Sequence, residues 1–370
     1  MDPVAFVDLQ TRHRLGHCAE FAPSLSEAAR AYSMQASSSG TLAWNASEGL
    51  PYPVNGWAGR VGEPHKLRSN EPGVKDYKFR ATLLSMLEAG LDFDAVIDMQ
   101  DARVRALAAS ATEIFPVVSF NRINGAPGRV LWHMPGPLHQ IGSAQFLGPF
   151  PDPDALPFSQ RAPKLVWRGS ITGRAGGTDR PQDDTYRFQK IFALVEKGKH
   201  DIAWAANRLD EFPRYHFVSR MALRPLTDVG FADQAGLHPL SNPLMQPLQR
   251  PAMGQLEQSR NKYIAVLRGA DLASSFFWTM NSGSLGLVMD CPWESFASVH
   301  FRPWEHYVPF RRDLSDLDER LDWCNTHQDD CAAMVRAAGD VCKMLAREDI
   351  RKEIDRCVID GLRSWLLPGS

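Results

Sequence analysis

The sequence predicts an α/β protein of two domains built on parallel sheets, because helical and strand patterns alternate along most of the chain. Apolar residues at helical spacing over 77–90 precede the buried-strand run FDAVIDM. RVRALAASA is expected to be helical, and FPVVSF a second strand. Such an order requires crossover connections and therefore parallel strands. The 370 residues are enough for two domains with cores of their own.

A second α/β run follows a stretch of turn-forming residues. This stretch, GPLHQIGSAQFLGPFPDPDALPF, is the candidate interdomain linker. After it, strands are expected at KLVWRGS, NKYIAVLRG and SLGLVMD, and helices at DDTYRFQKIFALVEKG and LASSFFWTMNSG. The last fifty residues or so are helical in pattern almost throughout.

These patterns divide the chain into four parts. Residues 1–76 are rich in Ser, Gly, Pro and Asn and are expected to form an irregular arm, in which SLSEAARAYSMQ is one helical candidate. Residues 77–150 form an N-terminal α/β domain, 151–345 a C-terminal α/β domain, and 346–370 a C-terminal helix.

Composition excludes several classes of function. With 41 Lys and Arg against 43 Asp and Glu, the net charge of −2 leaves no footprint for nucleic acid. An anionic ligand must therefore be met by a local group of cations. The 6 cysteines form no CxxC pair, so neither a zinc site nor a disulfide framework is expected.

The sequence contains no apolar run that could serve as a signal peptide or a membrane span. Scattered cysteines are typical of a reducing compartment. Both observations predict a cytoplasmic location. The lumen of the secretory pathway is the alternative if the sequence is a trimmed piece.

Two predicted strands end on an arginine followed by a glycine. The first end is Arg168-Gly169-Ser170, and its loop continues to Arg174. In open α/β sheets ligands bind beyond the carboxyl ends of the strands, where a guanidinium beside exposed backbone N–H groups suits a diphosphate. The alternative is a surface turn whose arginines are solvated.

The second end is Arg268-Gly269, which leads to Ser274 and Ser275 at the start of a predicted helix. Hydroxyl and N–H groups there could also meet phosphate. Having two such turns in the same half of the chain favours the ligand-binding interpretation more than one would.

The strand AVID in the N-terminal half is followed by Asp101. A carboxylate at the carboxyl end of a strand could accept a proton from an incoming hydroxyl. Asp98 competes for that role, although strand alternation sets the two on different sides. The structural alternative for Asp101 is a helix N-cap.

The segment 301–310 is dense in aromatic residues and prolines. Trp304, His306 and Tyr307 could stack on sugar faces, and a core-packing loop is the alternative. P-loop, HExxH, GxSxG and GxGxxG motifs are all missing from the sequence, and the last of these weakens an oxidoreductase interpretation.

Five stretches in this order resemble glycosyltransferase family 90, which includes capsule-associated xylosyltransferases, protein O-glucosyltransferases and lipopolysaccharide-modifying enzymes. The stretches are VIDMQD, FPVVSF, VWRGSITG, KYIAVLRG with ASSFFWTMNSGSLGL, and RPWEHYVPFRRDLSDL. They run from about Tyr77 to the C-terminus.

The resemblance implies a GT-B-like fold, with two Rossmann-like domains facing a cleft, and inverting transfer from a UDP-sugar without an obligatory metal or other cofactor. Asp101 matches the family's catalytic base, which reverses the N-cap preference. The donor-binding matches are Arg168, Gly169, Ser170, Gly269, Ser274 and Ser275, to which Arg174 and Arg268 are added as neighbouring cations. Trp304, His306 and Tyr307 match the motif assigned here to acceptor or sugar contacts.

One departure concerns the second phosphate contact. In the eukaryotic O-glucosyltransferases the Ala-Ser segment is followed by Phe-Arg, whereas this sequence has Phe276 and Phe277. Arg268, Arg174 or a hydroxyl would have to take over. The missing signal peptide and retention signal point to a bacterial-type glycan enzyme.

The expected function is therefore transfer of xylose or glucose from a UDP-sugar to a hydroxyl of a glycan or glycoconjugate. The first alternative is a non-catalytic carbohydrate- or nucleotide-binding protein with a degenerate cleft. The second is a Rossmann oxidoreductase.

Overall fold

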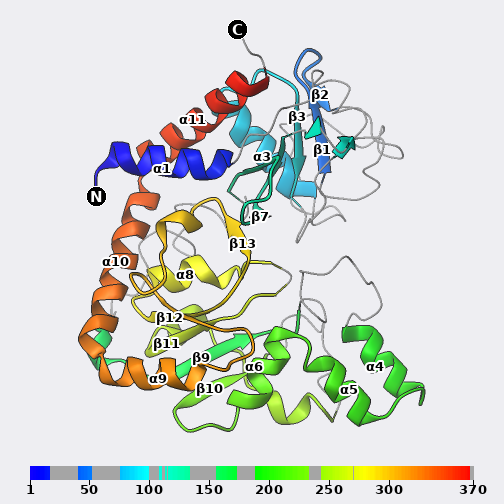
Figure 1. Cartoon of the computed structure of the whole chain (residues 1–370), viewed down its shortest axis with the longest axis vertical. Coiled ribbons are helices and arrows are strands. Elements are labelled where there is room, and N and C mark those ends of the chain that lie inside the picture. Colours follow the sequence, from blue (N-terminus) through cyan, green and yellow to red (C-terminus); the bar gives the residue numbers. More distant parts are fainter. Residues whose placement is uncertain are drawn as a thin grey trace. The chain divides into compact units, whose positions relative to one another are not determined.

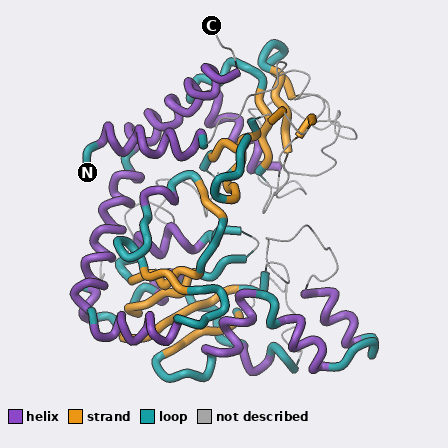
Figure 2. Tube along the Cα trace, in the orientation of Figure 1, coloured by secondary structure: helices purple, strands orange, loops and turns teal. Residues whose placement is uncertain are grey.

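The computed structural model describes residues 1–16, 41–51, 76–99, 108–110, 113–114, 116–133, 156–172, 188–232, 243–269 and 271–366. The chain forms two compact units, which are described separately. The first comprises Met1–Gly148, Pro292–His300 and Lys343–Ser370, and the second Pro149–Cys291 and Phe301–Cys342. Both combine helices with a sheet that contains parallel strands (Figures 1 and 2). The predicted α/β class is thus confirmed.

The sheet of the first unit has the strand order β2-β1-β3-β6-β8, in which β3, β6 and β8 are parallel and β1 is antiparallel to both of its neighbours. These elements are β1 (Thr41–Asn45), β2 (Leu50–Pro51), β3 (Ala95–Asp98), β6 (Val117–Ser119) and β8 (Arg129–Leu131). The predicted helix before β3 is α3 (Asp76–Glu88). All four residues of β3 are buried, as expected for a strand covered on both faces.

Two further strand pairs complete this unit. β7 (Asn121–Ile123) is antiparallel to β13 (Trp293–Ser295), which precedes a short 3-10 turn, η3 (Ser298–His300). β4 (Ala108–Ser110) is antiparallel to β5 (Glu113–Ile114). The helix expected over 103–111 is therefore wrong for residues 108–110, because strand pairing overrides the weak helical preference of so short a segment.

Part of the N-terminal segment expected to be irregular is regular structure. Residues Pro3–Leu15 form α1, and the strands β1 and β2 also lie within it. The side chain of Asp2 accepts a hydrogen bond from the N–H of Val4 at 3.1 Å, and proline stands at the first helical position. Both are signals for a helix start. The helix candidate SLSEAARAYSMQ lies outside the described residues.

A buried ion pair connects α1 to α11 (Glu348–Leu366). Arg14 is 2 % exposed, and its Nη1 donates to Asp355 Oδ1 at 2.5 Å while its Nε donates to the carbonyl of Leu131 at 2.9 Å. The guanidinium also lies 4.3 Å from the ring centre of Trp132. The two helices pack closely, since a Cβ on Gly361 would come within 2.5 Å of the Leu15 side chain.

The sheet of the second unit has five strands in the order β10-β9-β11-β12-β14, all parallel. They are β9 (Ala162–Gly169), β10 (Thr227–Phe231), β11 (Asn261–Val266), β12 (Leu285–Met289) and β14 (Val308–Phe310). Numbered in chain order, the arrangement is 2-1-3-4-5, one of the common doubly wound topologies. The strands predicted at 164–170, 261–269 and 284–290 are confirmed.

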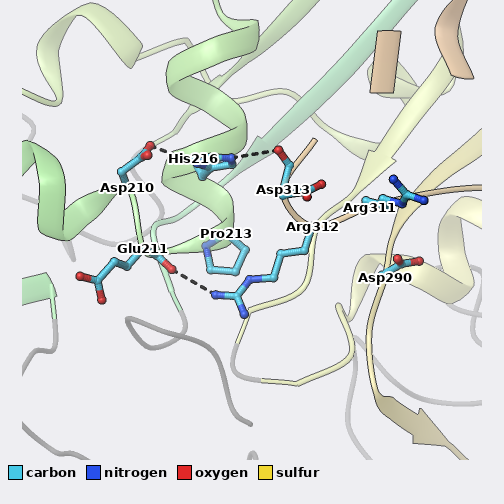
Figure 3. Close-up of a pocket in the computed structure, with 8 residues that line it drawn as sticks. All are labelled: Asp210, Glu211, Pro213, His216, Asp290, Arg311, Arg312 and Asp313. Carbon is cyan, nitrogen blue, oxygen red and sulfur yellow. Dashed lines mark hydrogen bonds and ion pairs between the residues drawn. The ribbon is translucent and has the colours of Figure 1, made fainter. Parts of the chain in front are cut away.

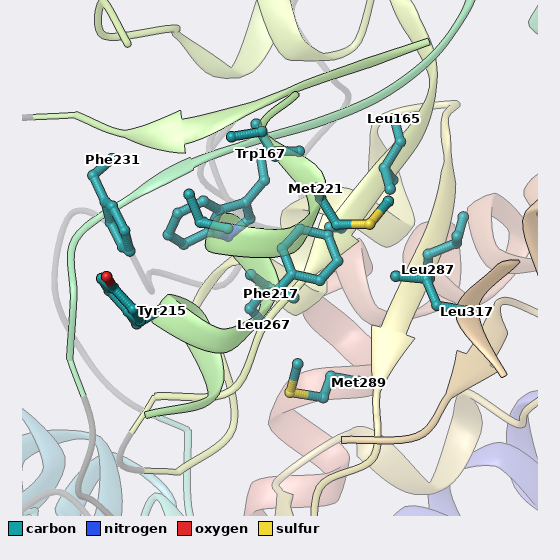
Figure 4. Packing of buried hydrophobic residues seen from close by; sticks show 14 of the residues in the cluster. Leu165, Trp167, Tyr215, Phe217, Met221, Phe231, Leu267, Leu287, Met289 and Leu317 are labelled. Carbon is teal, nitrogen blue, oxygen red and sulfur yellow. The ribbon is translucent and has the colours of Figure 1, made fainter. Parts of the chain in front are cut away.

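Helices lie on both faces of this sheet. One large apolar cluster joins Leu165 and Trp167 of β9 to Phe217 of α6 and to Leu317 of α9 (Figure 4). Val166 and Ile264, which alternate to the other face, pack against Trp278 of α8. The helical elements are η1 (Phe158–Gln160), α4 (Phe188–Glu196), α5 (Ile202–Leu209), α6 (Pro213–Met221), η2 (Gln246–Leu248), α7 (Gln255–Gln258), α8 (Ser275–Asn281) and α9 (Leu317–Thr326).

The C-terminal part is helical, as the sequence pattern predicted. α9 is followed by α10 (Gln328–Ala346) and α11. Helices long and apolar enough to cross a bilayer do not occur in the described ranges of the chain.

The surroundings of His133 predict how stability depends on pH. Burial lowers the pKa of His133 to about 4, although the negative charge of Asp355 acts in the opposite direction. Because an unfolded histidine has a pKa near 6.5, the unfolded chain binds the extra proton first as the pH falls. The free energy of unfolding should therefore drop by about 3 kcal/mol between pH 6.5 and 4 through this residue. Urea titrations across this range measure the slope.

The control for this measurement is His200, which is exposed. His133→Gln should remove the excess slope, whereas His200→Gln should keep it. A His133→Gln protein with the full pH dependence of the unaltered protein would contradict the assignment.

Candidate functional site

The topology of the second unit selects one edge of its sheet for ligand binding. β9 and β11 are neighbours, but the chain leaves them toward opposite faces, to α4–α6 after β9 and to α8 after β11. At such a switch point the connections separate beyond the carboxyl ends of the strands, where doubly wound folds bind their ligands. The predicted strand ends at Gly169 and Gly269 belong to these two strands. The structure thus brings both turns to the switch point.

Arg168 is held by protein acceptors. Its Nη2 donates to Asp228 Oδ1 at 2.6 Å, and its other nitrogens donate to the carbonyls of Asp228 and Pro251 at 2.7 and 2.8 Å. Arg168 stands opposite Gly230, so Asp228, two residues earlier on β10, shares its sheet face. The side chain is 4 % exposed. The predicted contact between Arg168 and a diphosphate remains a prediction. To make it, Arg168 would have to exchange its hydrogen bonds to Asp228 and Pro251 for bonds to the ligand.

The second turn is tightly packed. Arg268 is buried, with 3 % of its surface exposed. A Cβ on Gly269 would lie 2.8 Å from Thr172 Oγ1 and 3.1 Å from Arg214 Nη2. A larger residue here would push against the side chains of Thr172 and Arg214, which would have to shift.

Arg214 lies between the two turns and is a residue that sequence reasoning missed. It stands in the first turn of α6, where Nη1 donates to the carbonyl of Ser170 at 3.1 Å, and Nε and Nη2 donate to the carbonyl of Leu267 at 3.3 and 3.2 Å. Burial lowers the pKa of this guanidinium to about 10, while the charge of Asp271 opposes the shift. Arg214 is therefore still a cation at neutral pH.

A sequence signal for this residue did exist. Pro213 marks a helix start, and Tyr215, Val218 and Met221 follow at helical spacing and are buried. The helix could have been found from this pattern, but its nearness to the strand ends could not.

The start of α8 contributes the hydroxyl groups of Ser274 and Ser275, and residues 274–277 include no arginine or lysine. Ser274 is the N-cap residue and is exposed, and its side chain makes no capping hydrogen bond. Phe276 and Phe277 are buried, and both lie edge-to-face with Phe301 at ring-centre distances of 5.5 and 5.9 Å. Phe277 thus packs in an aromatic cluster, at the position where the resemblance led one to look for an arginine.

The aromatic segment forms a compact turn before β14. His306 is 4 % exposed, and its Nδ1 accepts a hydrogen bond from the N–H of Arg302 at 3.0 Å. Burial lowers the pKa of His306 and raises that of Tyr307 to about 12. Tyr307 packs edge-to-face on Phe276 at 5.8 Å. The sugar contacts predicted for His306 and Tyr307 remain predictions.

Trp304 lies at the opposite end of the strands from the switch point. It precedes β14, is 40 % exposed, and has a left-handed φ of 62°. Its ring meets Trp323 edge-to-face at 5.0 Å, with the Arg320 guanidinium 4.9 Å from its centre. A bulky residue in this backbone region is strained and is held by a hydrogen bond from its N–H to the carbonyl of Tyr307 at 2.8 Å. The sugar contact predicted for Trp304 remains a prediction.

A pocket of about 560 Å³ opens beside the same carboxyl edge (Figure 3). Asp290 follows β12 directly, and residues 311–313 follow β14. The opposite wall comes from residues 210–216, at the start of α6. The His216 Nδ1 lies 3.2 Å from Asp210 Oδ1, and Arg312 donates to the carbonyl of Glu211 at 3.3 Å. The volume is typical of sites for small molecules.

The remaining predicted residues can be placed only in part. Asp101 and Arg174 lie outside the described residues. Asp98, the competitor for the catalytic base, ends β3 and is 1 % exposed, so an acceptor hydroxyl has no access to it in this structure. In the described part of the chain, no group of three or more His, Cys, Asp or Glu side chains could hold a metal ion.

Several known proteins are similar to parts of this chain. An O-glucosyltransferase LpsA of Dichelobacter nodosus is 26 % identical over 198 residues, which are 53 % of this chain and 48 % of that protein. Protein O-glucosyltransferase 3 of Rattus norvegicus is 31 % identical over 84 residues, 23 % of this chain and 16 % of the relative. An uncharacterized protein of Frog virus 3 is 25 % identical over 195 residues, 50 % of this chain and 18 % of its own length. The chain thus spans less than half the length of each of these relatives.

The family comparison gives a match in the second half of the chain. The model of Glycosyl transferase family 90 matches residues 246–352. This segment contains the β11 turn with Arg268 and Gly269, and also Ser274 and Trp304, but it does not reach β9 or α6. Together with the relatives named O-glucosyltransferase, this match confirms the resemblance of the chain to glycosyl transferase family 90.

Proposed function

We propose that the protein is an inverting glycosyltransferase that moves xylose or glucose from a UDP-sugar to a hydroxyl group of a glycan or glycoconjugate. The observation that carries this proposal is the family 90 match over the segment that forms the β11 side of the switch point. Relatives named O-glucosyltransferase support transfer of a sugar to oxygen. The donor sugar and the acceptor are part of the proposal.

The proposal includes a GT-B-like arrangement of two Rossmann-like domains facing a cleft. The doubly wound sheet of the second unit supports a donor-binding domain of this kind, and the parallel strands β3, β6 and β8 support a similar fold for the first. The donor diphosphate would bind at the turns after β9 and β11. The five described cysteines are free thiols, which supports a reducing compartment such as the cytoplasm.

In the proposed reaction, the carboxylate of Asp101 takes the proton of the acceptor hydroxyl. The hydroxyl oxygen forms a bond to the anomeric carbon as the bond between that carbon and UDP breaks, and UDP leaves with the electron pair. The departing diphosphate gains negative charge, which cations and backbone N–H groups at the switch point would stabilise. Asp101 comes three residues after the end of β3.

Two observations favour a second candidate, a binding protein that has kept the site without turnover. Arg168 is bound to Asp228, and Phe277 is buried where the related glucosyltransferases have an arginine. Both observations reduce the number of cations available to a leaving diphosphate.

A panel of UDP-sugars distinguishes these two candidates. We expect one UDP-sugar to raise the melting temperature and to be consumed with release of UDP. At a hundred times its dissociation constant, such a ligand adds ~2.7 kcal/mol of stability. Stabilisation without UDP release, in the presence of varied acceptors, would favour the binding protein. If no UDP-sugar stabilises the protein, both candidates are wrong.

The catalytic base is tested by Asp101→Asn. Asparagine keeps the shape of the side chain but cannot take up the proton, so the rate of transfer should fall by ~10²–10⁴ while UDP-sugar affinity stays the same. The matched control is Asp92→Asn, which removes an exposed carboxylate that pairs with Arg363 at 3.1 Å and should leave activity unchanged. An active Asp101→Asn enzyme would contradict the assignment.

Metal independence is tested by chelation. We expect UDP release to continue in excess EDTA, because arginines and backbone N–H groups, rather than a divalent cation, would neutralise the diphosphate. Rates are compared in EDTA and with added Mn²⁺. Complete loss in EDTA that Mn²⁺ restores would show that a metal is required.

A further inference from the structure

The guanidinium of Arg214 links two loops that are almost a hundred residues apart in the sequence. It donates to the carbonyl of Ser170 after β9 and twice to the carbonyl of Leu267 after β11. The hydrogen bonds measure 3.1 to 3.3 Å. One planar cation therefore fixes the distance and the orientation of both strand ends at the switch point.

This arrangement also determines where the next backbone N–H groups point. In a trans peptide unit the C=O and the following N–H point in opposite directions. Because the carbonyls of Ser170 and Leu267 face Arg214, the N–H groups of Ile171 and Arg268 face away from it. Ile171 and Arg268 are themselves buried, at 0 and 3 % exposed, so Arg214 fixes the position of the two turns rather than a pair of open N–H groups.

We propose that Arg214 is a positioning residue for a diphosphate ligand, because it holds the turns after β9 and β11 in fixed positions at the switch point. The inference rests on the proposed UDP-sugar function and adds a residue outside the segment matched by the family model. Arg214 acts through the backbone, and no direct contact with the ligand is required of it.

Two features make arginine specific for this role. Its planar fork presents Nε and both Nη atoms in fixed directions and can reach two carbonyls at once, which a lysine ammonium on a flexible stem cannot do with the same geometry. Gly269 provides the space, since a Cβ there would approach Arg214 Nη2 to 3.1 Å and Thr172 Oγ1 to 2.8 Å. The ring of Trp167 lies 5.9 Å from the guanidinium.

The test compares Arg214→Lys and Arg214→Gln with the unaltered protein. The probes are UDP and uridine, which share base and ribose but differ in the diphosphate, with affinities from calorimetry and ligand-observed NMR. We expect UDP affinity to fall about tenfold to a hundredfold in both variants, since hydrogen bonds to charged groups are lost, while uridine affinity stays within about twofold. The lysine variant keeps the positive charge, so the loss of UDP affinity in this variant measures the effect of the planar guanidinium geometry.

The matched control is Arg224→Gln, which removes another arginine near α6. Arg224 is 44 % exposed and pairs with Asp318 on the surface, so UDP affinity should not change. If the Arg214 variants do not fold, as judged by circular dichroism, Gly269→Ala shifts the same guanidinium slightly in a protein that keeps it, because a Cβ there would lie 3.1 Å from Nη2. That variant should show the same selective loss of UDP affinity.

The outcomes separate this inference from the proposed function. If the unaltered protein binds UDP and the Arg214 variants bind it equally well, the inference is wrong and the proposed function stands. Equal losses for UDP and uridine would show a general structural role and also overturn the inference. If the unaltered protein binds neither UDP nor any UDP-sugar, the proposed function is wrong, and the inference with it.

Discussion

The directions in which the chain leaves β9 and β11 determine where the second unit can bind a ligand. The two strands are neighbours in one parallel sheet, but their connections cover opposite faces. The turns at Ser170 and Gly269 therefore lie side by side at this edge, and a Cβ on Gly269 would come within 2.8 Å of Thr172 Oγ1 in the β9 turn. Parallel strands in the order 2-1-3-4-5 produce this geometry whatever the side chains are. The side chains decide only which ligand it suits.

The alternation of side chains along β9 determines which partners Arg168 can contact. Arg168 and Trp167 are consecutive and must point to opposite faces of β9. Trp167 enters the large apolar core, and Arg168 turns to the other face, where Asp228 of the neighbouring strand is within reach. The cation that faces the carbonyls of both turns comes instead from α6. An arginine next to a glycine in the sequence is thus not the arginine that joins the two strand ends in space.

The sequence was sufficient for elements whose apolar pattern is strong and local. The buried strands β3, β9, β11 and β12 and the helices α3 and α8 were found because their residues are apolar on every face or at helical spacing. The pattern failed at Ala108–Ser110, where a short alanine-rich segment pairs with β5. It also failed at α1, although Asp2 and Pro3 marked the start of that helix.

The candidate site could also be predicted only in part from the sequence. Both strand ends could be recognised from Arg-Gly pairs, but their adjacency depends on strand order, which the sequence does not state. Arg214 was not predicted because its role depends on contacts with Ser170 and Leu267, each about fifty positions away in the sequence. The place of Trp304 could not be predicted either, since its position before β14 and its contact with α9 put it at the end of the strands away from both turns.

The way the first unit is assembled from the chain has a consequence for synthesis on the ribosome. Strand β7 pairs with β13, some 170 residues later, and α1 is held by α11 at the other end of the sequence. Neither contact can form until its later partner has left the exit tunnel. The second unit ends at Cys342, before α11 begins at Glu348, so its sheet can form before α1 is joined to α11. The helix α1, although it is synthesised first, should therefore dock after the sheet of the second unit has formed, in contrast to the usual N-terminal-first order.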